Sequence, residues 1–363
     1  MKISLVGPIK ENAKEGKTNP KIFIYQSAFE KMGYETRLFS TSLPKIRVFT
    51  LLKRIIESLK YGDTVLLMFG GNASRKLTGL FLRLNKKYKK RLVLCPFGTG
   101  PLNPLLSHED ADTVDLFINK LDFGKIKDDK MAKKLHQLDL VVVQNNILKQ
   151  CFEKFYGLTN VFVLPNFRRR DVNSLISNYK KKSIVYVSRI VEEKGIIDLI
   201  KVISLINSSG TNEKIYLDIY GEMHLYDDSM RFFNSNLNEY IKYYGTIPNG
   251  NVQKIISSHA ISCLPTKYGG EGTPGFLIES LLAGVPIVVS SFSQVNSLIK
   301  DGFDGLVFKM NDINDLHSKI ISIIFDDTKI MAMRKNAFQT GESYLLENNL
   351  ANIKIMLEGG NID

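Results

Sequence analysis

Nine residues, Glu271-Gly-Thr-Pro-Gly-Phe-Leu-Ile-Glu279, join a glycine-rich loop to a predicted helix. Thr273 is a favoured N-cap residue and Pro274 suits the first helical position, so we expect a helix over residues 274–283. The free amides and the positive dipole end of such a helix form an anion site. Gly275 lets a ligand approach the backbone closely. The stretch therefore predicts that an anionic ligand binds at the start of this helix.

The two ends of this stretch carry carboxylates in different surroundings. Glu271 lies in the loop Tyr268-Gly-Gly-Glu-Gly272, where we expect it to point into a cleft. Glu279 lies one to two turns into the helix, where its carboxylate can meet a neutral polyol such as ribose. A lone Glu is usually a solvated surface residue. The apolar run Ser280-Leu-Leu-Ala283 predicts a buried helix, so the carboxylate of Glu279 needs a partner.

Two cations precede this stretch in the chain. Arg189 follows the predicted strand Ser183–Ser188, and Lys194 comes just before a predicted helix that starts at Ile196. Two fixed cations beside a helix start can clamp a diphosphate, with Arg forking onto two oxygens. An ordinary exposed basic loop explains the pair equally well when it is taken by itself.

Short apolar runs alternate with helical patterns along the chain, which predicts an α/β fold with parallel sheets covered by helices on both faces. Predicted strands of the first half are Lys2–Val6, Glu35–Phe39, Thr64–Phe69, Leu92–Cys95, Leu138–Val143 and Val161–Leu164, with helices over Val48–Leu59 and Leu77–Tyr88. Those of the second half are Ser183–Ser188, Ile215–Tyr220, Tyr240–Tyr244, Ala260–Leu264 and Pro286–Ser290. Helices are predicted between them, and Thr340–Leu357 is predicted as a terminal helix.

The alternation is interrupted at Leu164-Pro-Asn-Phe-Arg-Arg-Arg-Asp171, which is typical of a linker. We therefore expect two doubly wound, Rossmann-like domains, over residues 1–166 and 167–339. Residues 340–363 are expected to form a helix that packs back on the first domain. Ligands in such sheets bind beyond the carboxyl ends of the strands, so the cleft between the domains is the expected site.

Composition bounds the class of protein. The 363 residues carry 49 Lys plus Arg against 37 Asp plus Glu, a net charge of +12, which attracts nucleic acid, anionic lipid or phosphorylated small molecules. The three cysteines are few, odd in number and far apart, which disfavours a disulfide framework. No secretion signal or apolar run long enough for a membrane span is visible, so we expect a cytoplasmic protein.

The order and spacing of motifs over residues 183–310 resemble glycosyltransferase family 4, whose members have the GT-B fold. The first half of the chain resembles it only loosely. The matching residues are Ser188-Arg189, Glu193-Lys194-Gly195, Tyr220-Gly221-Glu222, Gly245, Val252, Leu264-Pro265-Thr266, Glu271, Glu279-Ser280, Ala283-Gly284-Val285-Pro286, Gly302 and Gly305.

The resemblance implies a retaining transfer of a sugar, of hexose type, from a nucleoside diphosphate sugar, without a metal and with no other cofactor. It places the diphosphate on Arg189 and Lys194 and on the backbone around Gly275, Phe276 and Leu277. It places the ribose on Glu279. Glu271 is implied to contact the transferred sugar, as the catalytic residue. The acceptor is expected to be a glycan or a lipid-linked sugar in surface polysaccharide synthesis.

Some segments depart from the family pattern. Ser291-Phe-Ser-Gln294 stands where relatives often have a Gly-Gly turn, and the N-terminal glycine-rich loop is reduced to Gly7 followed by Gly16 and Lys17. Gly7 and Lys17 are candidates for contact with donor or acceptor, although an exposed loop explains Lys17 as well. His108 is a third candidate, because many relatives keep a His near the reacting sugar.

Other classes of protein are less well supported. The five histidines show no metal-ligand pairing, and Asp110-Ala-Asp112 does not follow an apolar strand, so no metal site is expected. Gly98-Thr-Gly100 lacks the third glycine of a dinucleotide fingerprint. The remaining alternatives are a basic nucleic-acid-binding protein, a nucleotide-sugar epimerase of the same fold, and a sugar-binding subunit without turnover.

Two stretches, Lys45–Lys60 and Arg75–Arg91, combine helical apolar spacing with many cations. Outer helices of an α/β domain explain the apolar side completely. The charge exceeds what solubility requires, and no aromatic interleaving points to nucleic acid, so no nucleic-acid partner is expected. We therefore hypothesise that the N-terminal half lies on an anionic membrane surface, as a peripheral protein on its inner face.

Overall fold

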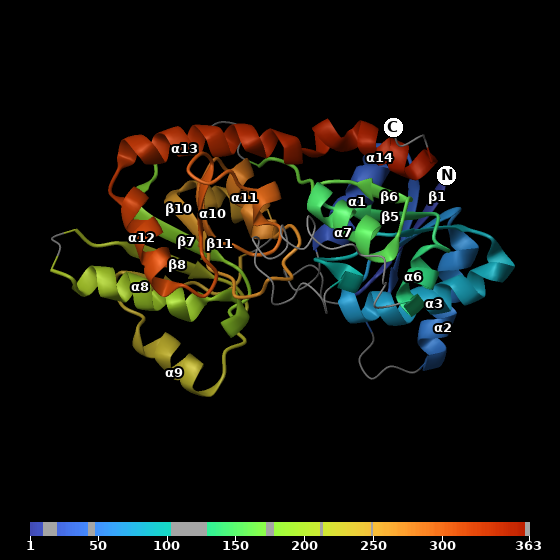
Figure 1. Cartoon of the computed structure of the whole chain (residues 1–363), viewed down its shortest axis with the longest axis horizontal. Helices are drawn as coiled ribbons and strands as arrows, with labels where there is room; N and C mark the ends of the chain where they lie inside the picture. The colour runs from blue at the N-terminus through green and yellow to red at the C-terminus, as the bar shows by residue number, and fades with distance from the viewer. Residues whose placement is uncertain are drawn as a thin grey trace. The chain divides into compact units, whose positions relative to one another are not determined.

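A computed structural model describes residues 1–9, 20–42, 48–102, 129–171, 178–210, 213–247 and 250–359 of the chain. These residues fall into two compact units, each built on a six-stranded parallel sheet (Figure 1). Unit 1 comprises the described residues up to Asn166 together with residues 346–359, and unit 2 comprises those from Phe167 to Leu345.

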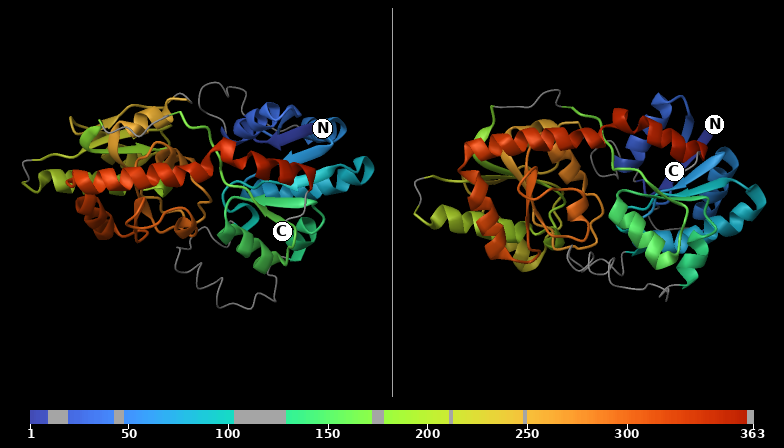
Figure 2. Two further views of the ribbon diagram at one scale, coloured as in Figure 1. Left: turned by 90° about the horizontal axis from the view of Figure 1, so that it is seen from above. Right: turned by 45° about the horizontal axis from the view of Figure 1, so that its top comes forward.

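The sheet of unit 1 has the order β2-β1-β3-β4-β5-β6. Its strands are β1 (Lys2–Gly7), β2 (Glu35–Ser40), β3 (Thr64–Leu67), β4 (Arg91–Leu94), β5 (Leu140–Val143) and β6 (Val161–Val163). Its helices are α1 (Pro20–Lys31), α2 (Val48–Tyr61), α3 (Gly71–Tyr88), η2 (Gly100–Leu102), α6 (Asp129–Leu135), α7 (Asn146–Tyr156) and α14 (Leu346–Glu358). Figure 2 shows helices on both faces of this sheet.

The strands of unit 1 form where continuous apolar runs can be buried on both faces. All four residues of β3 and all four of β5 are buried, which is the pattern of a central parallel strand. Local signals set the helix ends: the Asn145 side chain accepts from the Leu148 amide (2.9 Å) at the start of α7, and Gly157 follows its end with a φ of 63°.

The sheet of unit 2 has the order β12-β11-β10-β7-β8-β9. Its strands are β7 (Lys180–Val187), β8 (Tyr216–Tyr220), β9 (Ile241–Tyr243), β10 (His259–Leu264), β11 (Ile287–Ser290) and β12 (Gly305–Phe308). Its helices are η3 (Glu192–Lys194), α8 (Ile196–Ser208), α9 (Asp227–Ser235), α10 (Val252–Ser257), α11 (Gly275–Leu282), η4 (Val295–Ser297), α12 (Ile313–Ile324), α13 (Asp327–Thr340) and η5 (Gly341–Tyr344).

Strand order in unit 2 fixes where a ligand can bind. Read from its other edge, the sheet follows the doubly wound dinucleotide-type order, in which the first and fourth strands, here β7 and β10, lie side by side. The chain moves outward in opposite directions from these two strands, and ligands of doubly wound sheets bind beyond the carboxyl ends of such a pair. Apolar side chains of α8, α9 and α12 pack on one face of the sheet. Apolar side chains of α10 and α11 pack on the other face.

The predicted terminal helix over Thr340–Leu357 is confirmed over Leu346–Leu357, which lie in α14, but it does not begin at Thr340. The chain instead forms α13, the 3-10 turn η5 and then α14, with Leu345 extended between the last two. Gly341, the first residue of η5, packs closely against α11, because a β-carbon there would lie 2.8 Å from the Leu281 carbonyl oxygen. The helices α1, α6, α7 and α13 and the strand β12 were not predicted from the sequence.

The arginine run taken for a linker is folded into unit 2. Arg168 is buried, its amide donates to the Tyr344 carbonyl (2.8 Å), and it forms an isolated bridge with Leu345. The guanidinium of Arg170 donates to the carbonyls of Leu282 (3.1 Å) and Phe338 (2.8 Å). These cations fix the backbone at the entrance to unit 2, so they are structural rather than solvated.

Candidate functional site

The candidate site lies in unit 2, beyond the carboxyl ends of β7 and β10. Arg189 and η3 follow β7, and the loop with Glu271 follows β10. The strands β7 and β10 are neighbours in the sheet, at the point where the strand order reverses. The sheet therefore brings the Arg189–Lys194 loop close to the loop that carries Glu271.

Two glycines allow the loops at this edge to pack closely. Gly195 ends η3 with a φ of +72°, and a β-carbon there would lie 1.8 Å from the Pro265 carbonyl oxygen. Gly221, with a φ of +149°, would place a β-carbon 1.7 Å from the Ser188 carbonyl oxygen. Any side chain at either position would push the loops apart.

Lys194 and Glu271 form an ion pair, which the sequence did not predict. The ammonium of Lys194 contacts Oε1 of Glu271, and both side chains are nearly buried, with 14% and 11% of their surface exposed. The Thr266 hydroxyl donates to the same oxygen (3.1 Å). Without a ligand, therefore, the charge of Lys194 is already compensated by Glu271.

Arg189 is exposed, and its backbone carbonyl accepts from the Tyr186 hydroxyl (3.1 Å). Its guanidinium makes no ion pair with any residue in the described part of the chain. The predicted clamp thus consists of one cation held by a carboxylate and one that is open to an incoming anion.

The helix between the two carboxylates starts one residue later than expected. Pro274, not Thr273, is the N-cap of α11, and no side chain caps the first turn. The amides of Gly275, Phe276 and Leu277 occupy that turn, where no intrahelical acceptor exists. The side chains of Phe276 and Leu277 are buried in the core, so both residues face a ligand with backbone amides alone.

Glu279 is held by two partners that the sequence did not predict. Its Oε1 lies 3.3 Å from Nε of Arg168, and its Oε2 accepts from Nε2 of Gln253 (2.7 Å). Burial raises the pKa of Glu279, and the charge of Arg168 and the hydrogen bond from Gln253 oppose that rise. A carboxylate offers about four lone-pair sites, so this pairing leaves acceptor capacity for ligand hydroxyls.

The departure Ser291-Phe-Ser-Gln294 has a structural role at the same edge. The Ser293 hydroxyl donates to the Gly269 carbonyl (2.7 Å), and its amide points to the same oxygen (3.3 Å). The Ser290 hydroxyl donates to the Thr266 carbonyl (2.6 Å). These bonds anchor the part of the loop that precedes Glu271, at Thr266 and Gly269.

The remaining predicted residues lie elsewhere. Gly7 is buried at the end of β1 in unit 1, where a β-carbon would lie 2.8 Å from the Met68 carbonyl oxygen. Lys17 and His108 lie outside the described residues. Within the described ranges, no group of three or more His, Cys, Asp and Glu is placed to hold a metal ion. Cys95, Cys151 and Cys263 are buried and free, and burial raises the pKa of Cys95 to about 12.

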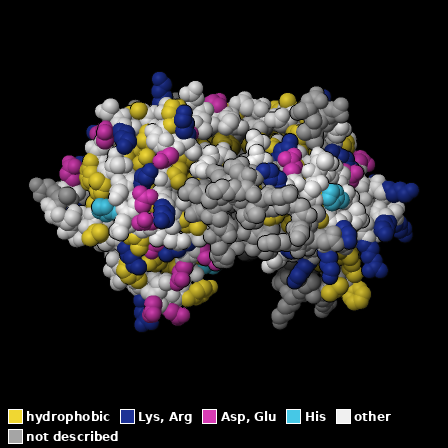
Figure 3. Space-filling view, in the orientation of Figure 1, with side chains coloured by type: hydrophobic (Ala, Val, Ile, Leu, Met, Phe, Trp, Pro, Cys, Tyr) yellow, Lys and Arg dark blue, Asp and Glu magenta, His cyan; other side chains and the backbone are white. Residues whose placement is uncertain are grey.

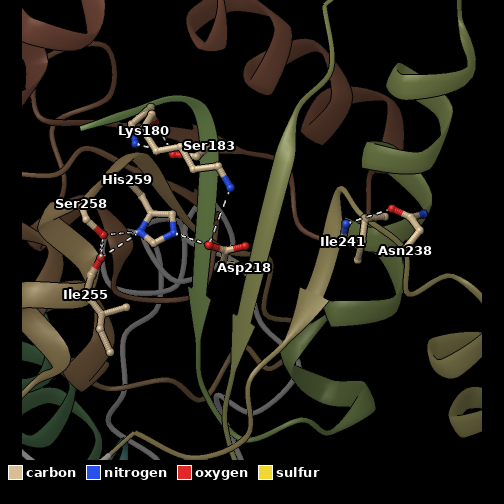
Figure 4. Close-up of polar contacts among 9 residues, drawn as sticks. Lys180, Ser183, Asp218, Asn238, Ile241, Ile255, Ser258 and His259 are labelled. Carbon is tan, nitrogen blue, oxygen red and sulfur yellow. Dashed lines mark hydrogen bonds and ion pairs between the residues drawn. The ribbon is translucent and has the colours of Figure 1, made fainter. Parts of the chain in front are cut away.

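A second buried polar cluster lies at the opposite, amino end of β10 (Figure 4). Nε2 of His259 lies 3.0 Å from Oδ2 of Asp218, and its Nδ1 lies 2.8 Å from the Ile255 carbonyl oxygen. The ammonium of Lys180 is 4.0 Å from the same Asp218 oxygen. The buried Arg334 of α13 donates to the His259 carbonyl (2.6 Å), so the cluster joins the sheet to that helix.

Comparison with known proteins relates the chain to sugar transferases. Poly(ribitol-phosphate) alpha-N-acetylglucosaminyltransferase of Staphylococcus aureus is 24% identical over 225 residues, 61% of this chain and 42% of that protein. UDP-Gal:alpha-D-GlcNAc-diphosphoundecaprenol alpha-1,3-galactosyltransferase of Escherichia coli is 22% identical over 210 residues, 54% of each chain. The chain thus spans about half the length of these curated relatives.

The solved structure of sucrose-phosphate synthase from Thermosynechococcus elongatus is similar over 99% of this chain and 98% of its own, with a TM-score of 0.73 and 14% identity. At that identity the likeness concerns the fold. The two parallel six-stranded sheets with their helices are the GT-B fold, as the sequence predicts. Residues 167–340, which hold the whole candidate site, match the family model of Glycosyl transferases group 1.

Proposed function

We propose that the chain transfers a sugar from a nucleoside diphosphate sugar to a glycan or lipid-linked acceptor during the synthesis of a surface polysaccharide. The observation that carries this proposal is the joining of Lys194, Glu271 and the first turn of α11 at the switch between β7 and β10. The two curated relatives, named as transferases to a polyol phosphate polymer and to a diphosphoundecaprenol-linked sugar, support the class of acceptor.

The charges of the site suit a leaving diphosphate. Arg189 and the amides of Gly275, Phe276 and Leu277 attract the diphosphate, and Lys194 exchanges its bond to Glu271 for a phosphate oxygen. That exchange frees the Glu271 carboxylate beside the place where positive charge develops on the sugar. Preorganised groups of this kind stabilise developing charge strongly, because little reorganisation accompanies the reaction.

In the transfer itself, the bond from the anomeric carbon to the diphosphate oxygen breaks and a bond to the acceptor hydroxyl oxygen forms. The hydroxyl proton leaves with the nucleoside diphosphate. We propose retention at the anomeric carbon and a hexosyl donor, in line with the resemblance to glycosyltransferase family 4. Glu279, oriented by Arg168 and Gln253, accepts hydrogen bonds from the ribose.

The first experiment is a thermal-shift panel of nucleoside diphosphate sugars, followed by a transfer assay with the donor that raises Tm most. Arg189→Gln should weaken the shift, whereas Arg231→Gln, the same change at an exposed arginine of α9 in unit 2, should not. Transfer that persists in excess EDTA would support a metal-independent reaction. The proposal fails if no nucleotide sugar raises Tm and no sugar is transferred.

The rival functions give different results in the same assays. An epimerase releases free nucleotide without an acceptor sugar. A nucleic-acid-binding protein shifts plain duplex DNA with a steep dependence on salt.

The surface of unit 1 supports a peripheral membrane association. Val48 and Phe49, at the start of α2, expose 63% and 85% of their surface. The neighbouring α3 carries Lys and Arg side chains and no acidic residue, and Figure 3 shows such cations around both helices. Apolar side chains beside a basic face suit an anionic lipid surface, where each cation contributes about 1 kcal/mol. Across the described residues, every helix is too short or too polar to cross a bilayer.

We propose that this face rests on anionic lipid. Flotation with vesicles of phosphatidylglycerol and phosphatidylcholine should recover the protein, and pure phosphatidylcholine should recover much less. Phe49→Ser should reduce recovery, while Tyr226→Ser, an equally drastic change at a side chain 72% exposed in unit 2, should not. Equal recovery with both kinds of vesicle at moderate salt would overturn the proposal.

A further inference from the structure

A pocket of about 280 Å³ lies in unit 1, between β2 and α2. Its wall includes Arg37 and Phe39 of β2, Arg54 and Glu57 of α2, and Ser42 just beyond the strand. This volume is at the lower end of the range for small-molecule sites, so it suits a ligand of a few carbon atoms.

Two guanidinium groups face this pocket without carboxylate partners. Arg37 lies over the rings of Phe39 and Tyr61, at 5.4 and 5.7 Å from their centroids. Nη1 of Arg54 donates to the Ser40 carbonyl (3.1 Å). In the described part of unit 1, neither arginine makes an ion pair. The pocket therefore carries two positive charges that an incoming anion can compensate.

The same wall also offers groups for neutral hydroxyls. Glu57 lies 4.0 Å from Lys53, at the limit of an ion pair, and its side chain is 44% exposed. Ser42 adds a hydroxyl that hydrogen-bonds to no other described residue. Guanidinium groups bind phosphate oxygens in a forked geometry, and a carboxylate accepts from hydroxyls. A bare anion would leave Glu57 without a function, whereas a hydroxylated phosphate ester uses both kinds of group.

Position within the fold supports a binding role. Ser40 ends β2 and pairs with Gly7 at the end of β1, so the pocket reaches the carboxyl edge of the sheet. Ligands of open α/β sheets bind at that edge. The Ser40 hydroxyl donates to the Ile9 carbonyl (2.5 Å) and so fixes the chain where it leaves β1.

We propose that this pocket binds the phosphate ester of a polyol, with Arg37 and Arg54 on the phosphate and Glu57 and Ser42 on the hydroxyls. This assigns an acceptor that contains such an ester, and in that respect it rests on the proposed function. The shared chemistry has two sources, a soluble polyol phosphate or a lipid headgroup.

Calorimetric titration of the full chain with glycerol 3-phosphate, glycerol and inorganic phosphate tests the pocket. Glycerol 3-phosphate should bind more tightly than either fragment. Arg37→Gln should weaken its binding by about tenfold, because a charge-assisted hydrogen bond is lost. Arg37 makes no hydrogen bond or ion pair with another described residue, so Tm should fall only slightly, through the loss of its contacts with Phe39 and Tyr61. Arg54→Lys, which keeps the charge and shortens the fork, should weaken binding less than Arg54→Gln.

Arg83→Gln removes an exposed cation of α3 outside the pocket and is the matched control. The inference is overturned if Arg83→Gln weakens binding as much as Arg37→Gln, or if glycerol 3-phosphate does not bind wild-type protein. Nucleotide binding separates the two proposals: protein that binds UDP but no polyol phosphate keeps the proposed function and loses this one. Protein that binds polyol phosphate but no nucleotide does the reverse.

A second titration separates the two sources of the ligand. If phosphatidylglycerol vesicles displace glycerol 3-phosphate from the wild-type protein, and Arg37→Gln weakens binding of both, the headgroup is the source. If the vesicles leave glycerol 3-phosphate bound, the soluble ester is the source.

Discussion

Two buried polar pairs lie at opposite ends of β10, and their surroundings differ. At the amino end, His259 contacts Asp218 and the Ile255 carbonyl, and Lys180 lies beside Asp218 (Figure 4). At the carboxyl end, Lys194 and Glu271 lie between loops, beside exposed Arg189 and the uncapped start of α11. The first pair has its contacts supplied by the protein. The second stands beside groups that still need an anion.

The difference separates a pair that holds the fold from a pair that responds to a ligand. The His259 ring and the Asp218 carboxylate at the amino end connect β7, β8, β10 and α10 of unit 2. At the carboxyl end, we propose that an anionic ligand replaces Glu271 as the partner of Lys194. Burial and charge are similar in the two places, so neither quantity identifies the functional pair without its neighbours.

The largest expected effect concerns Lys194. Lys194→Met should lower kcat by about 10²–10³-fold, because a preorganised positive group is lost where negative charge develops. It also leaves the Glu271 carboxylate nearly buried without a counter-ion, so Tm should fall. Steady-state transfer kinetics and calorimetry measure both. A variant with wild-type kcat would remove Lys194 from the reaction.

The amino-end pair should affect stability and not chemistry. Asp218→Asn should destabilise unit 2 by about 2 kcal/mol, the value for a hydrogen bond to a charged group, with unchanged transfer per folded molecule. Burial acts to raise the pKa of Asp218, but the hydrogen bond from His259 and the charge of Lys180 outweigh it and hold the pKa below the usual value.

The sign of the pH dependence follows from that lowered pKa. A carboxyl group with a lowered folded-state pKa stabilises the fold above its unfolded pKa, and this stabilisation is lost as the pH falls through the folded pKa. The difference in Tm between wild type and Asp218→Asn should therefore shrink as the pH drops below the usual aspartate range. A difference that stays constant as the pH falls well below that range would show that the lost stability does not come from the ionised carboxylate.

A smaller effect is expected at Glu279. Glu279→Gln should raise the KM for the donor by about tenfold with little change in kcat, because the charged acceptor for the ribose hydroxyls is lost. Gln253→Ala should raise KM less, since it removes only a group that orients Glu279. A fall in kcat at constant KM would place Glu279 nearer the reacting carbon than we propose.

The smallest effect on stability is expected at Arg189, which is exposed and makes no ion pair among the described residues. Arg189→Gln should change the free energy of unfolding by less than about 0.5 kcal/mol while weakening donor binding. The loss of stability in Lys194→Met, compared with that in Arg189→Gln, thus distinguishes a cation paired with a carboxylate from a cation without an ion pair among the described residues. Equal losses of stability would contradict that distinction.

The strands of both sheets except β12 were predictable, because they are short apolar runs between turns. Val48 was correctly placed as the start of a helix, and Val252–Ser257 was predicted with its observed bounds. The failures concern details that no local pattern shows. The sequence suggested one terminal helix over Thr340–Leu357, whereas the extended residue Leu345 separates η5 from α14.

The site was predictable in its residue types and not in its internal bonds. Motif order placed Arg189, Lys194, Glu271 and Glu279 on adjacent elements. The pairing of Lys194 with Glu271, and of Glu279 with Arg168 and Gln253, joins residues up to 111 positions apart, from Arg168 to Glu279. Such partners are set by the strand order, which the sequence pattern leaves open. A buried role for the arginine run at Arg168 could have been inferred from its position, which precedes the first strand of unit 2.

The place of α14 has a consequence for synthesis on the ribosome. Its residues belong to unit 1, where Arg91 donates to the Leu357 carbonyl (2.8 Å) and Lys31 pairs with Glu347 (3.0 Å). All of unit 2 is translated between the two parts of unit 1. Since domains fold as they emerge, the unit that is begun first is completed last, and during translation the nascent chain holds a finished unit 2 beside an unfinished unit 1.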